Sequence, residues 1–263
     1  MHPDLPVALE AAREGAAVVR EGFSGAAEVH MKGEVNPVTA IDTDAEDSVR
    51  AVLGRERPAD QVLGEEEGGT GWDEGRVWIV DPLDGTVNFV HHMPHVAVSV
   101  ALWEDGAPLV GVVIDVMHEE EFAAVAGLGS LLNGQPVRVS GQDDLGEALV
   151  VTGFPYDRRR RADDYATVVG AVLARVQGLR RLGSAALDFA WVACGRFDAY
   201  WEYGLAPWDA AAGVLLVEEA GGQVGTVTGA RFDLDSPTVV ASNGLVHDAL
   251  AGVVHASLPA DLR

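Results

Sequence analysis

The chain has 263 residues, of which 48% are hydrophobic, so it can bury a sizeable core. Its formal charge of −23 at pH 7, with Lys32 as the only lysine, argues against general affinity for nucleic acid or anionic membranes. Cys194 is the only cysteine, which excludes an intrachain disulfide and a cysteine-based zinc site. No signal-peptide pattern and no membrane-length apolar run is present, so we expect a cytoplasmic protein without membrane contact.

The first part of the chain predicts two helices and then an antiparallel sheet. Apolar residues at three- and four-residue spacing indicate an amphipathic helix from Leu5 to Phe23, and a second helix is expected after Thr43. Four strand-like stretches follow, separated by Gly, Pro and acidic turns: Val77 to Val80, Val96 to Trp103, Leu109 to Val116 and Glu121 to Ala126.

Beyond Ser140 the pattern changes to alternating short strands and helices, which is typical of an α/β fold. The expected strands are ALVVTGF and FDAYWE, and the expected helices are Asp163 to Val176, Ala185 to Ala193 and Asp209 to Ala220. The polar stretch SGQDDLGE separates the two textures. We therefore predict an N-terminal α+β half, residues 1–142, and a C-terminal α/β half, residues 143–263.

Acidic side chains stand at four expected element ends. They are Asp42 in VTAIDTD, Glu65 and Glu66 in VLGEEEGG, Asp81 and Asp84 in VDPLDGT, and Asp209 in APWDAAAG. Each stretch alone can be an acidic turn or a helix cap. If three or four of them converge at about 4 Å, each like-charge pair costs about 4 kcal/mol at an effective dielectric of 20, so the cluster requires counter-cations. Oxygen donors without Cys or an obligatory His select Mg²⁺ or Mn²⁺.

The stretch DPLDGT also predicts an anion site. Pro82 removes a ladder donor and is expected to stop the preceding strand, while Gly85 permits a tight turn. Thr86 then stands at a helix start, where free N–H groups bind phosphate. A phosphate site beside a divalent-metal cluster would make metal-assisted phosphoryl transfer to water the natural chemistry.

Several blocks resemble the inositol monophosphatase family of Mg²⁺-dependent, lithium-sensitive sugar phosphatases. They are GEE, DPLDGTVNF followed by HHMP, RRLGSAALDFAWVACGRFDAYWE, WDAAAGVLLVEEAGG and VVASN, in the family's order over nearly the whole chain. The resemblance implies a layered α-β-α-β-α sandwich, a homodimer and two or three Mg²⁺ ions per site, with Mn²⁺ as a substitute.

The resemblance also implies roles for particular residues. One metal would be held by Glu65, Asp81 and the Leu83 carbonyl, and a second by Asp81, Asp84 and Asp209, with Glu65 serving a weaker third. Thr86 would position the attacking water together with Glu65 or Asp42. Phosphate would bind the Gly85 and Thr86 backbone beside Asp84 and Asp209, and the polyol would contact Gly183, Ser184, Ala185 and Glu202.

Three features depart from this pattern or stand beside it. Asn36 replaces the Asp that many relatives carry before the VT pair, which would weaken the third metal site. Pro94 prevents a helical alignment of His91 with His95, so we expect one surface-facing His at a dimer contact and no metal ligation by His91, His92 or His95. The run Arg158 to Arg161 is either a solvated loop or an arginine lid that attracts phosphate.

The expected activity is therefore hydrolysis of inositol monophosphate or a similar polyol phosphate by metal-activated water. Histidinol phosphate, fructose 1,6-bisphosphate and nucleotide phosphates are alternative substrates on the same fold. A base or a second phosphate would require aromatic or basic residues near Ser184 and Glu202, and the negative charge of Glu202 disfavours a second phosphate there. A non-catalytic binding protein, acting in transcription or RNA processing, is the alternative of another class.

Overall fold

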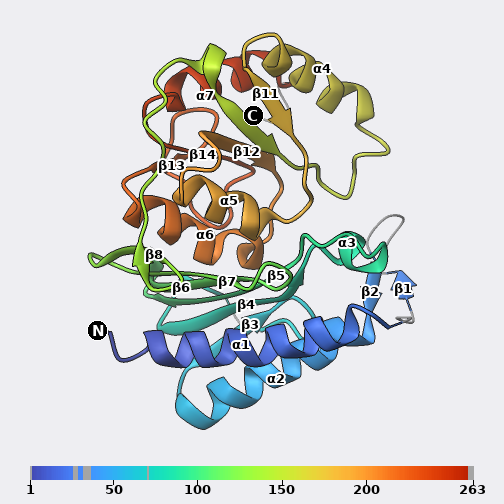
Figure 1. The fold of residues 1–263 in the computed structure, drawn as a ribbon, viewed down its shortest axis with the longest axis vertical. Helices are drawn as coiled ribbons and strands as arrows, with labels where there is room; N and C mark the ends of the chain where they lie inside the picture. Colours follow the sequence, from blue (N-terminus) through green and yellow to red (C-terminus); the bar gives the residue numbers. More distant parts are fainter. Residues whose placement is uncertain (1, 26–28, 32–36, 70, 260–263) are drawn as a thin grey trace.

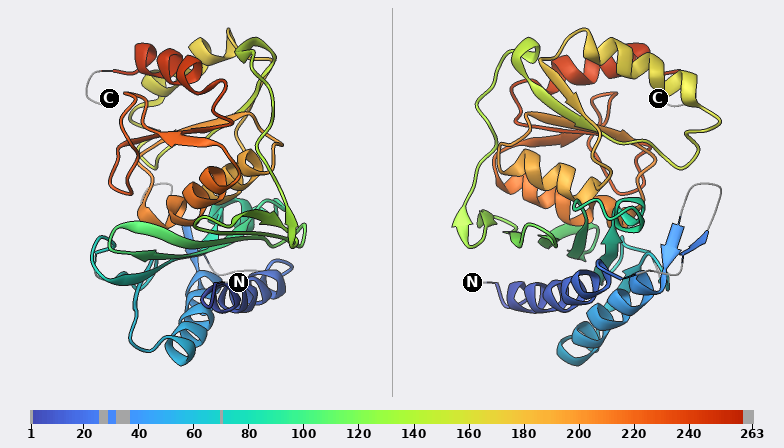
Figure 2. Two further views of the ribbon diagram at one scale, coloured as in Figure 1. Left: turned by 90° about the vertical axis from the view of Figure 1, so that its left-hand side faces the viewer. Right: turned by 45° about the vertical axis from the view of Figure 1, so that its right-hand side comes forward.

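The computed structural model describes residues 2–25, 29–31, 37–69 and 71–259. Its helices and sheets stack in five alternating layers, α-β-α-β-α, with the N-terminus beside the lowest layer of Figure 1. This confirms the predicted layered sandwich. The two further views show the same stacking, with one helix pair between the two large sheets (Figure 2).

The lowest helix layer and the first large sheet come from the N-terminal part of the chain. Helices α1 (Leu5–Gly22) and α2 (Ala40–Glu56) cover one face of this sheet. The sheet has the order β3-β4-β5-β6-β7-β8-β9, and only the β3–β4 pair is parallel. The strands are β3 (Gln61–Gly64), β4 (Arg76–Asp84), β5 (Ala97–Glu104), β6 (Ala107–Asp115), β7 (Glu120–Val125), β8 (Gly129–Leu132) and β9 (Gln135–Pro136). A separate antiparallel pair joins β1 (Val29–Met31) to β2 (Pro37–Thr39).

The second large sheet has the order β11-β10-β12-β14-β13. Its strands are β10 (Leu149–Thr152), β11 (Gly178–Arg180), β12 (Ala199–Tyr203), β13 (Gln223–Gly225) and β14 (Thr238–Ser242). Helices α5 (Ala185–Ala193) and α6 (Pro207–Glu219) lie between the two sheets, and α4 (Ala162–Leu173) and α7 (His247–Ser257) cover the outer face (Figure 1). Two short helices, α3 (Thr86–Val90) and the 3₁₀ turn Leu145–Glu147, complete the described elements.

Three apolar clusters hold the layers together. The first joins both sheets through α5 and α6, and it includes Ile79 and Phe122 of one sheet and Phe189 and Tyr200 of the other half. The second lies under α1 and α2, and the third under α4 and α7. The first cluster contains residues of both predicted halves. The division of the chain into halves 1–142 and 143–263 therefore stays a prediction. No helix in the described ranges is long and apolar enough to cross a membrane.

The predicted elements are present, most of them with shifted ends, and one prediction about them is wrong. The strand before the DPLDGT motif does not stop at Pro82: β4 continues to Asp84, which pairs with Ala97 of β5. The register shifts between Asp81 and Asp84, so the missing N–H of Pro82 is accommodated in a bulge. The second helix begins at Ala40, three residues before Thr43, because Thr39 caps it.

Candidate active site

The bulge at the end of β4 directs two carboxylates toward one place. Asp81 is 1% exposed, and its Oδ1 accepts a hydrogen bond from the Leu83 N–H at 3.1 Å. Asp84 is 8% exposed and ends the strand. A regular strand would send residues 81 and 84 to opposite faces, so the bulge brings their side chains together.

The turn after β4 depends on a glycine. Gly85 has φ = 93°, and a Cβ there would lie 3.0 Å from the His95 carbonyl oxygen and 3.3 Å from that of Gly183. Its left-handed backbone leads directly into α3, whose first residue is Thr86. The Thr86 hydroxyl lies 3.1 Å from Asp42 Oδ1 and 3.2 Å from the Leu83 carbonyl oxygen. The turn therefore links the strand end to the start of α2.

Asp42 serves first as a helix cap. Its Oδ2 accepts hydrogen bonds from the Thr39 N–H at 2.8 Å and from the Thr39 hydroxyl at 2.6 Å. Burial raises the pKa of the Asp42 carboxyl, although these hydrogen bonds oppose the change. Asp42 can cap α2 and contact Thr86 at the same time, because Oδ2 faces Thr39 and Oδ1 faces Thr86.

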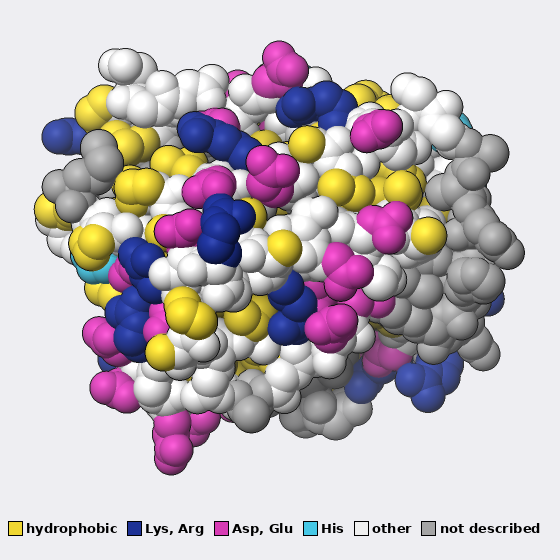
Figure 3. Space-filling model, turned by 90° about the horizontal axis from the view of Figure 1, so that it is seen from below, with side chains coloured by type: hydrophobic (Ala, Val, Ile, Leu, Met, Phe, Trp, Pro, Cys, Tyr) yellow, Lys and Arg dark blue, Asp and Glu magenta, His cyan; other side chains and the backbone are white. Residues whose placement is uncertain are grey.

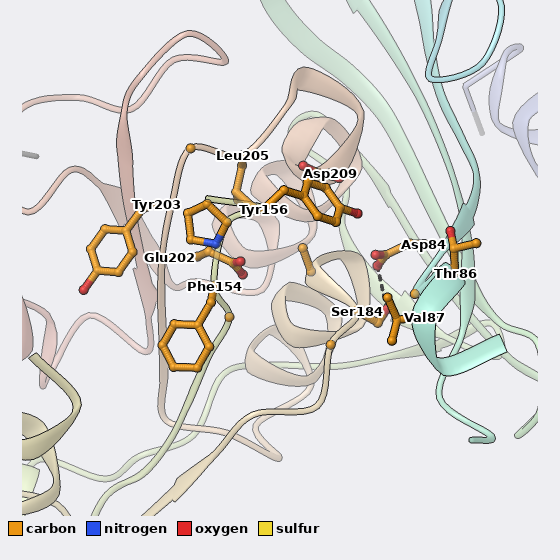
Figure 4. A pocket seen from close by; sticks show the side chains of 16 residues that line it. Asp84, Thr86, Val87, Phe154, Tyr156, Ser184, Glu202, Tyr203, Leu205 and Asp209 are labelled. Atoms are coloured by element: carbon orange, nitrogen blue, oxygen red, sulfur yellow. Dashed lines mark hydrogen bonds between the residues drawn. The ribbon is translucent and has the colours of Figure 1, made fainter. Parts of the chain in front are cut away.

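Asp84 joins the two halves of the chain. Its Oδ2 accepts a hydrogen bond from the Ser184 hydroxyl at 2.5 Å (Figure 4) and another from the Ala186 N–H at 2.7 Å, at the start of α5. Burial raises the pKa of Asp84 to about 6, against the effect of these donors. Ser184, predicted to contact the polyol, thus holds a predicted metal ligand.

Asp209 reaches the same place from the first turn of α6. Its Oδ2 accepts a hydrogen bond from the Ala206 N–H at 2.7 Å, so it also caps its own helix. Burial, followed by the negative charges of Asp84 and Glu65, raises its pKa well above the usual range. For Asp81 the causes are burial and the charges of Glu65, Asp84 and Asp209.

The loop that carries Glu65 is held by a buried carboxylate that the sequence did not single out. Glu65 directly follows β3 and is half-buried. Glu46 of α2 is fully buried and accepts hydrogen bonds from the Glu66 N–H at 2.8 Å and the Glu67 N–H at 3.1 Å. A Cβ at Gly64 would collide with the Glu46 carboxylate. The helical spacing of Glu46 and Arg50, 2.7 Å apart, was the one available signal in the sequence.

The four predicted carboxylates therefore act on one another electrostatically, which the separate motifs could not establish. Within the described ranges, no three His, Cys, Asp or Glu side chains form a ready-made metal-binding group. The donor chemistry nevertheless fits a hard cation. One oxygen of Asp81 and one of Asp209 accept backbone N–H groups, and the second oxygen of each accepts no hydrogen bond in the described structure. The mutual repulsion of these carboxylates, which raises the pKa values of Asp81 and Asp209, favours a cation among them.

A pocket opens beside this cluster. Figure 4 shows Asp84, Thr86 and Val87 on one side and Phe154, Glu202 and Tyr203 on the other. Its lining comprises Asp84, Gly85, Thr86, Val87, Gly153, Phe154, Pro155, Tyr156, Gly183, Ser184, Ala185, Glu202, Tyr203, Gly204, Leu205 and Asp209. All predicted phosphate and polyol contacts thus border one hollow. The sequence analysis identified Arg158 to Arg161 in the loop after β10, but it missed the pocket-lining residues 153–156 of the same loop, whose aromatic side chains gave only a weak signal.

Glu202 is a buried carboxylate on the far side of the pocket. It is 8% exposed, its Oε2 accepts a hydrogen bond from the Tyr200 hydroxyl at 2.5 Å, and a Cβ at Gly153 would collide with it. Burial raises its pKa to about 7, while Tyr200 and the positive charge of Arg181 oppose the change.

The remaining predictions fall outside this cluster. His91 and His92 are exposed, whereas His95 is 6% exposed and packs edge-on against Trp191, with ring centroids 5.1 Å apart. Burial lowers the pKa of His95 to about 4. The prediction about Asn36 lies outside the described residues.

Asp188 is a buried acid that the sequence analysis did not identify. It is 1% exposed on α5, and neither carboxylate oxygen has a hydrogen-bond partner in the described structure. Burial, followed by the charges of Glu202 and Asp84, raises its pKa well above the usual range. The unfolded chain releases this proton more readily than the folded chain. The loss of stability caused by Asp188 therefore becomes larger as pH rises above the ordinary pKa of Asp.

We therefore expect Asp188→Asn to raise the free energy of unfolding by about 1–3 kcal/mol at pH 8, and by less at pH 5. Denaturant unfolding at the two pH values measures the difference. The exposed Asp143→Asn variant is the matched control and should change neither value. An Asp188→Asn effect independent of pH would contradict this explanation.

The layered fold is of the sugar phosphatase type, and comparisons with known proteins support that fold class. The sequence profile of the inositol monophosphatase family matches residues 1–259. The chain belongs to the inositol monophosphatase family.

Individual relatives cover nearly the whole chain. Nus factor SuhB of Pseudomonas aeruginosa is 40% identical and covers 100% of both chains. Inositol-1-monophosphatase of Mesorhizobium japonicum is 42% identical over 89% of this chain and 88% of its own. The solved inositol monophosphatase structure from Anabaena is 39% identical with a TM-score of 0.88, covering 98% of each chain.

Proposed function

We propose that the protein is a Mg²⁺-dependent phosphomonoesterase that hydrolyses inositol monophosphate or a similar polyol phosphate. The observation that carries the proposal is the electrostatic repulsion among Glu65, Asp81, Asp84 and Asp209 beside the Gly85 turn, which raises the pKa values of Asp81 and Asp209. Membership of the inositol monophosphatase family supports it. The proposed setting is the cytoplasm, and lithium is expected to inhibit the reaction.

The proposed metal ligands are those that the family resemblance implies. Glu65, Asp81 and the Leu83 carbonyl would hold one Mg²⁺ ion, and Asp81, Asp84 and Asp209 a second. A bound Mg²⁺ ion supplies Lewis-acid activation of water and neutralises the charge on phosphate. Either Mg²⁺ or Mn²⁺ suits this all-oxygen donor set. Occupancy of a third position would depend on Glu65.

The protein's own residues would orient the reactants. The Thr86 hydroxyl, positioned by Asp42 and the Leu83 carbonyl, would hold the attacking water, with Asp42 or Glu65 receiving its proton. The N–H groups of Gly85 and Thr86 would bind phosphate. Gly183, Ser184, Ala185 and Glu202 would contact the polyol across the pocket.

Phosphate release by the purified protein with Mg²⁺ tests this proposal. The substrates are inositol 1-phosphate, histidinol phosphate, fructose 1,6-bisphosphate and a nucleotide 3′-phosphate, each with and without lithium. Lithium-sensitive release from inositol 1-phosphate would support the proposed chemistry and substrate. Preference for another substrate would retain the chemistry and replace the substrate.

A second candidate is a Nus-factor role, which the 40% identity to Nus factor SuhB over the full chain favours. Absence of phosphate release from every substrate, with the protein folded and Mg²⁺ bound, would favour this non-catalytic alternative.

We also propose a homodimer. An apolar hollow lies beside α5, lined by residues that include Met93, Leu182, Trp191 and Phe197, and the Met93 side chain is 42% exposed. Multi-angle light scattering should give twice the 27.7 kDa chain mass. Met93→Glu should then yield monomer, while Leu128→Glu, at the 65% exposed Leu128 elsewhere, should not. A monomeric wild-type protein would contradict the proposal.

A further inference from the structure

Two arginines, Arg158 and Arg181, flank the pocket, and the positive charge of Arg181 acts on both Glu202 and Asp84. Arg158 follows the pocket residues Phe154 and Tyr156 in the loop after β10. An Arg181 guanidinium nitrogen lies 2.5 Å from the position that a Cβ on Gly183 would take, and Gly183 lines the pocket. Burial and the positive charges of Arg181 and Arg159 lower the pKa of Arg158. Several positive charges therefore lie close together beside the pocket.

These arginines differ from those on the face covered by α1 and α2. On the face covered by α1 and α2, arginine and acidic side chains are interspersed (Figure 3), and Arg13, Arg55, Arg57 and Arg76 there form ion pairs. Within the described ranges, neither Arg158 nor Arg181 forms an ion pair with a carboxylate. In a chain with 41 acidic and 18 basic residues, unpaired neighbouring arginines are available for an anionic ligand.

The aromatic residues of the pocket support these guanidinium groups. The Arg158 guanidinium carbon lies 5.6 Å from the centre of the Tyr156 ring, and that of Arg181 lies 5.9 Å from the centre of the Phe154 ring. Arg158 Nη1 donates a hydrogen bond to the Pro155 carbonyl oxygen at 3.3 Å, and a guanidinium over a ring can direct its other N–H groups to a phosphate. It also occupies a ring face on which a nucleobase would stack. The arrangement therefore favours a second phosphate over a base.

The loop that carries Arg158 is attached to the protein core. The rings of Phe154 and Tyr165 lie 5.9 Å apart, and Tyr165 stacks on Tyr203 at 5.4 Å. The Tyr165 hydroxyl donates a hydrogen bond to Asp157 Oδ1 at 2.7 Å, next to Arg158. These contacts pre-organise the loop, which lowers the entropic cost of binding an anion there.

We propose that Arg158 and Arg181 form a second anion subsite, which selects phosphomonoesters whose alcohol carries another phosphate. The inference rests on the proposed phosphomonoesterase function and specifies its substrate class as a polyol bisphosphate. The nearby Glu202 weakens such binding when it is ionised. Its pKa of about 7 leaves a large neutral fraction near pH 7.

The test compares kcat/KM for myo-inositol 1,4-bisphosphate and myo-inositol 1-phosphate with Mg²⁺. The variants are wild type, the double variant Arg158→Gln and Arg181→Gln, and the control Arg138→Gln, an exposed arginine on another loop. Wild type should prefer the bisphosphate. The double variant should lose about tenfold or more on the bisphosphate, mainly through KM, because charge-assisted hydrogen bonds are lost. The kcat/KM of the double variant on the monophosphate should stay within about threefold of the wild-type value. The Arg138→Gln control should match wild type on both substrates.

Two outcomes would overturn the subsite. An equal loss on both substrates, removed by high salt, would mean that the arginines only steer anions to the pocket. A preference for adenosine 3′-monophosphate over the bisphosphate would mean that Arg158, Arg181 and their aromatic neighbours recognise a base.

Calorimetric titration with the same two ligands separates this inference from the proposed function. Arginine-dependent binding of the bisphosphate without any turnover would overturn the proposed function and support the subsite. Equal affinity of wild type for the two ligands would overturn the subsite, whether or not turnover is observed.

Discussion

Asp84→Asn is expected to abolish Mg²⁺-dependent phosphate release. The substitution removes a negative charge from the proposed ligand set, and metal stabilisation of the transition state is worth several kcal/mol. We expect kcat/KM to fall about a thousandfold or more, since each 1.36 kcal/mol corresponds to a factor of ten. A steady-state assay on the preferred substrate measures the loss.

The fold should survive this substitution. The amide oxygen of the new asparagine side chain can still accept hydrogen bonds from the Ser184 hydroxyl and the Ala186 N–H, which Asp84 Oδ2 accepts in the wild type. Far-ultraviolet circular dichroism should therefore match wild type. The control Asp143→Asn makes the same chemical change at an exposed position and should keep full activity. Wild-type turnover by a folded Asp84→Asn protein would disprove the assignment of Asp84 as a ligand.

Mg²⁺ is expected to raise the melting temperature of the protein after treatment with a chelator. Asp81 and Asp84 are buried, Asp209 is half-buried, and the three carboxylates repel one another, so a cation that binds only the folded state stabilises it. At a Mg²⁺ concentration of about 100 times Kd the gain is about 2.7 kcal/mol. For a chain of this size, that corresponds to roughly 5–10 °C.

The pH dependence of the same experiment has a definite sign. Because the folded-state pKa of Asp84 is raised to about 6, its penalty in the chelated protein is absent below the ordinary pKa of Asp and grows as pH rises toward 6. Differential scanning calorimetry at pH 5 and pH 7.5 should therefore show the larger Mg²⁺ effect at pH 7.5. Asp84→Asn should reduce this difference. A melting temperature unaffected by Mg²⁺ and chelator at both pH values would refute the proposed metal cluster.

The agreement between the predicted and observed elements has a local physical basis. Apolar spacing located α1, and the Ala185–Ala193 helix was predicted with the bounds that the structure has. The layered architecture followed from the family motifs and was confirmed. The failure at Pro82 arose because a bulge depends on the partner strand β5, which local sequence does not reveal.

The candidate site divides in the same way. Residue types and spacing indicated the available groups, which are carboxylate oxygens, a glycine turn and a helix start, all within short segments. The sequence could not determine how those segments meet, because a carboxylate at a helix start can act as a cap alone, and Asp42 and Asp209 each accept such a hydrogen bond at the start of their own helix.

Only the tertiary structure decided which side chains share a pocket. Ser184 reaches Asp84 across 100 positions of the chain, and Arg158 lies near Arg181 because β10 and β11 are adjacent strands. Contacts at such separation arise from burying the apolar faces of two sheets and the helices between them. The amino-acid sequence by itself therefore determined the chemistry available, and packing of the layers decided where its charges meet.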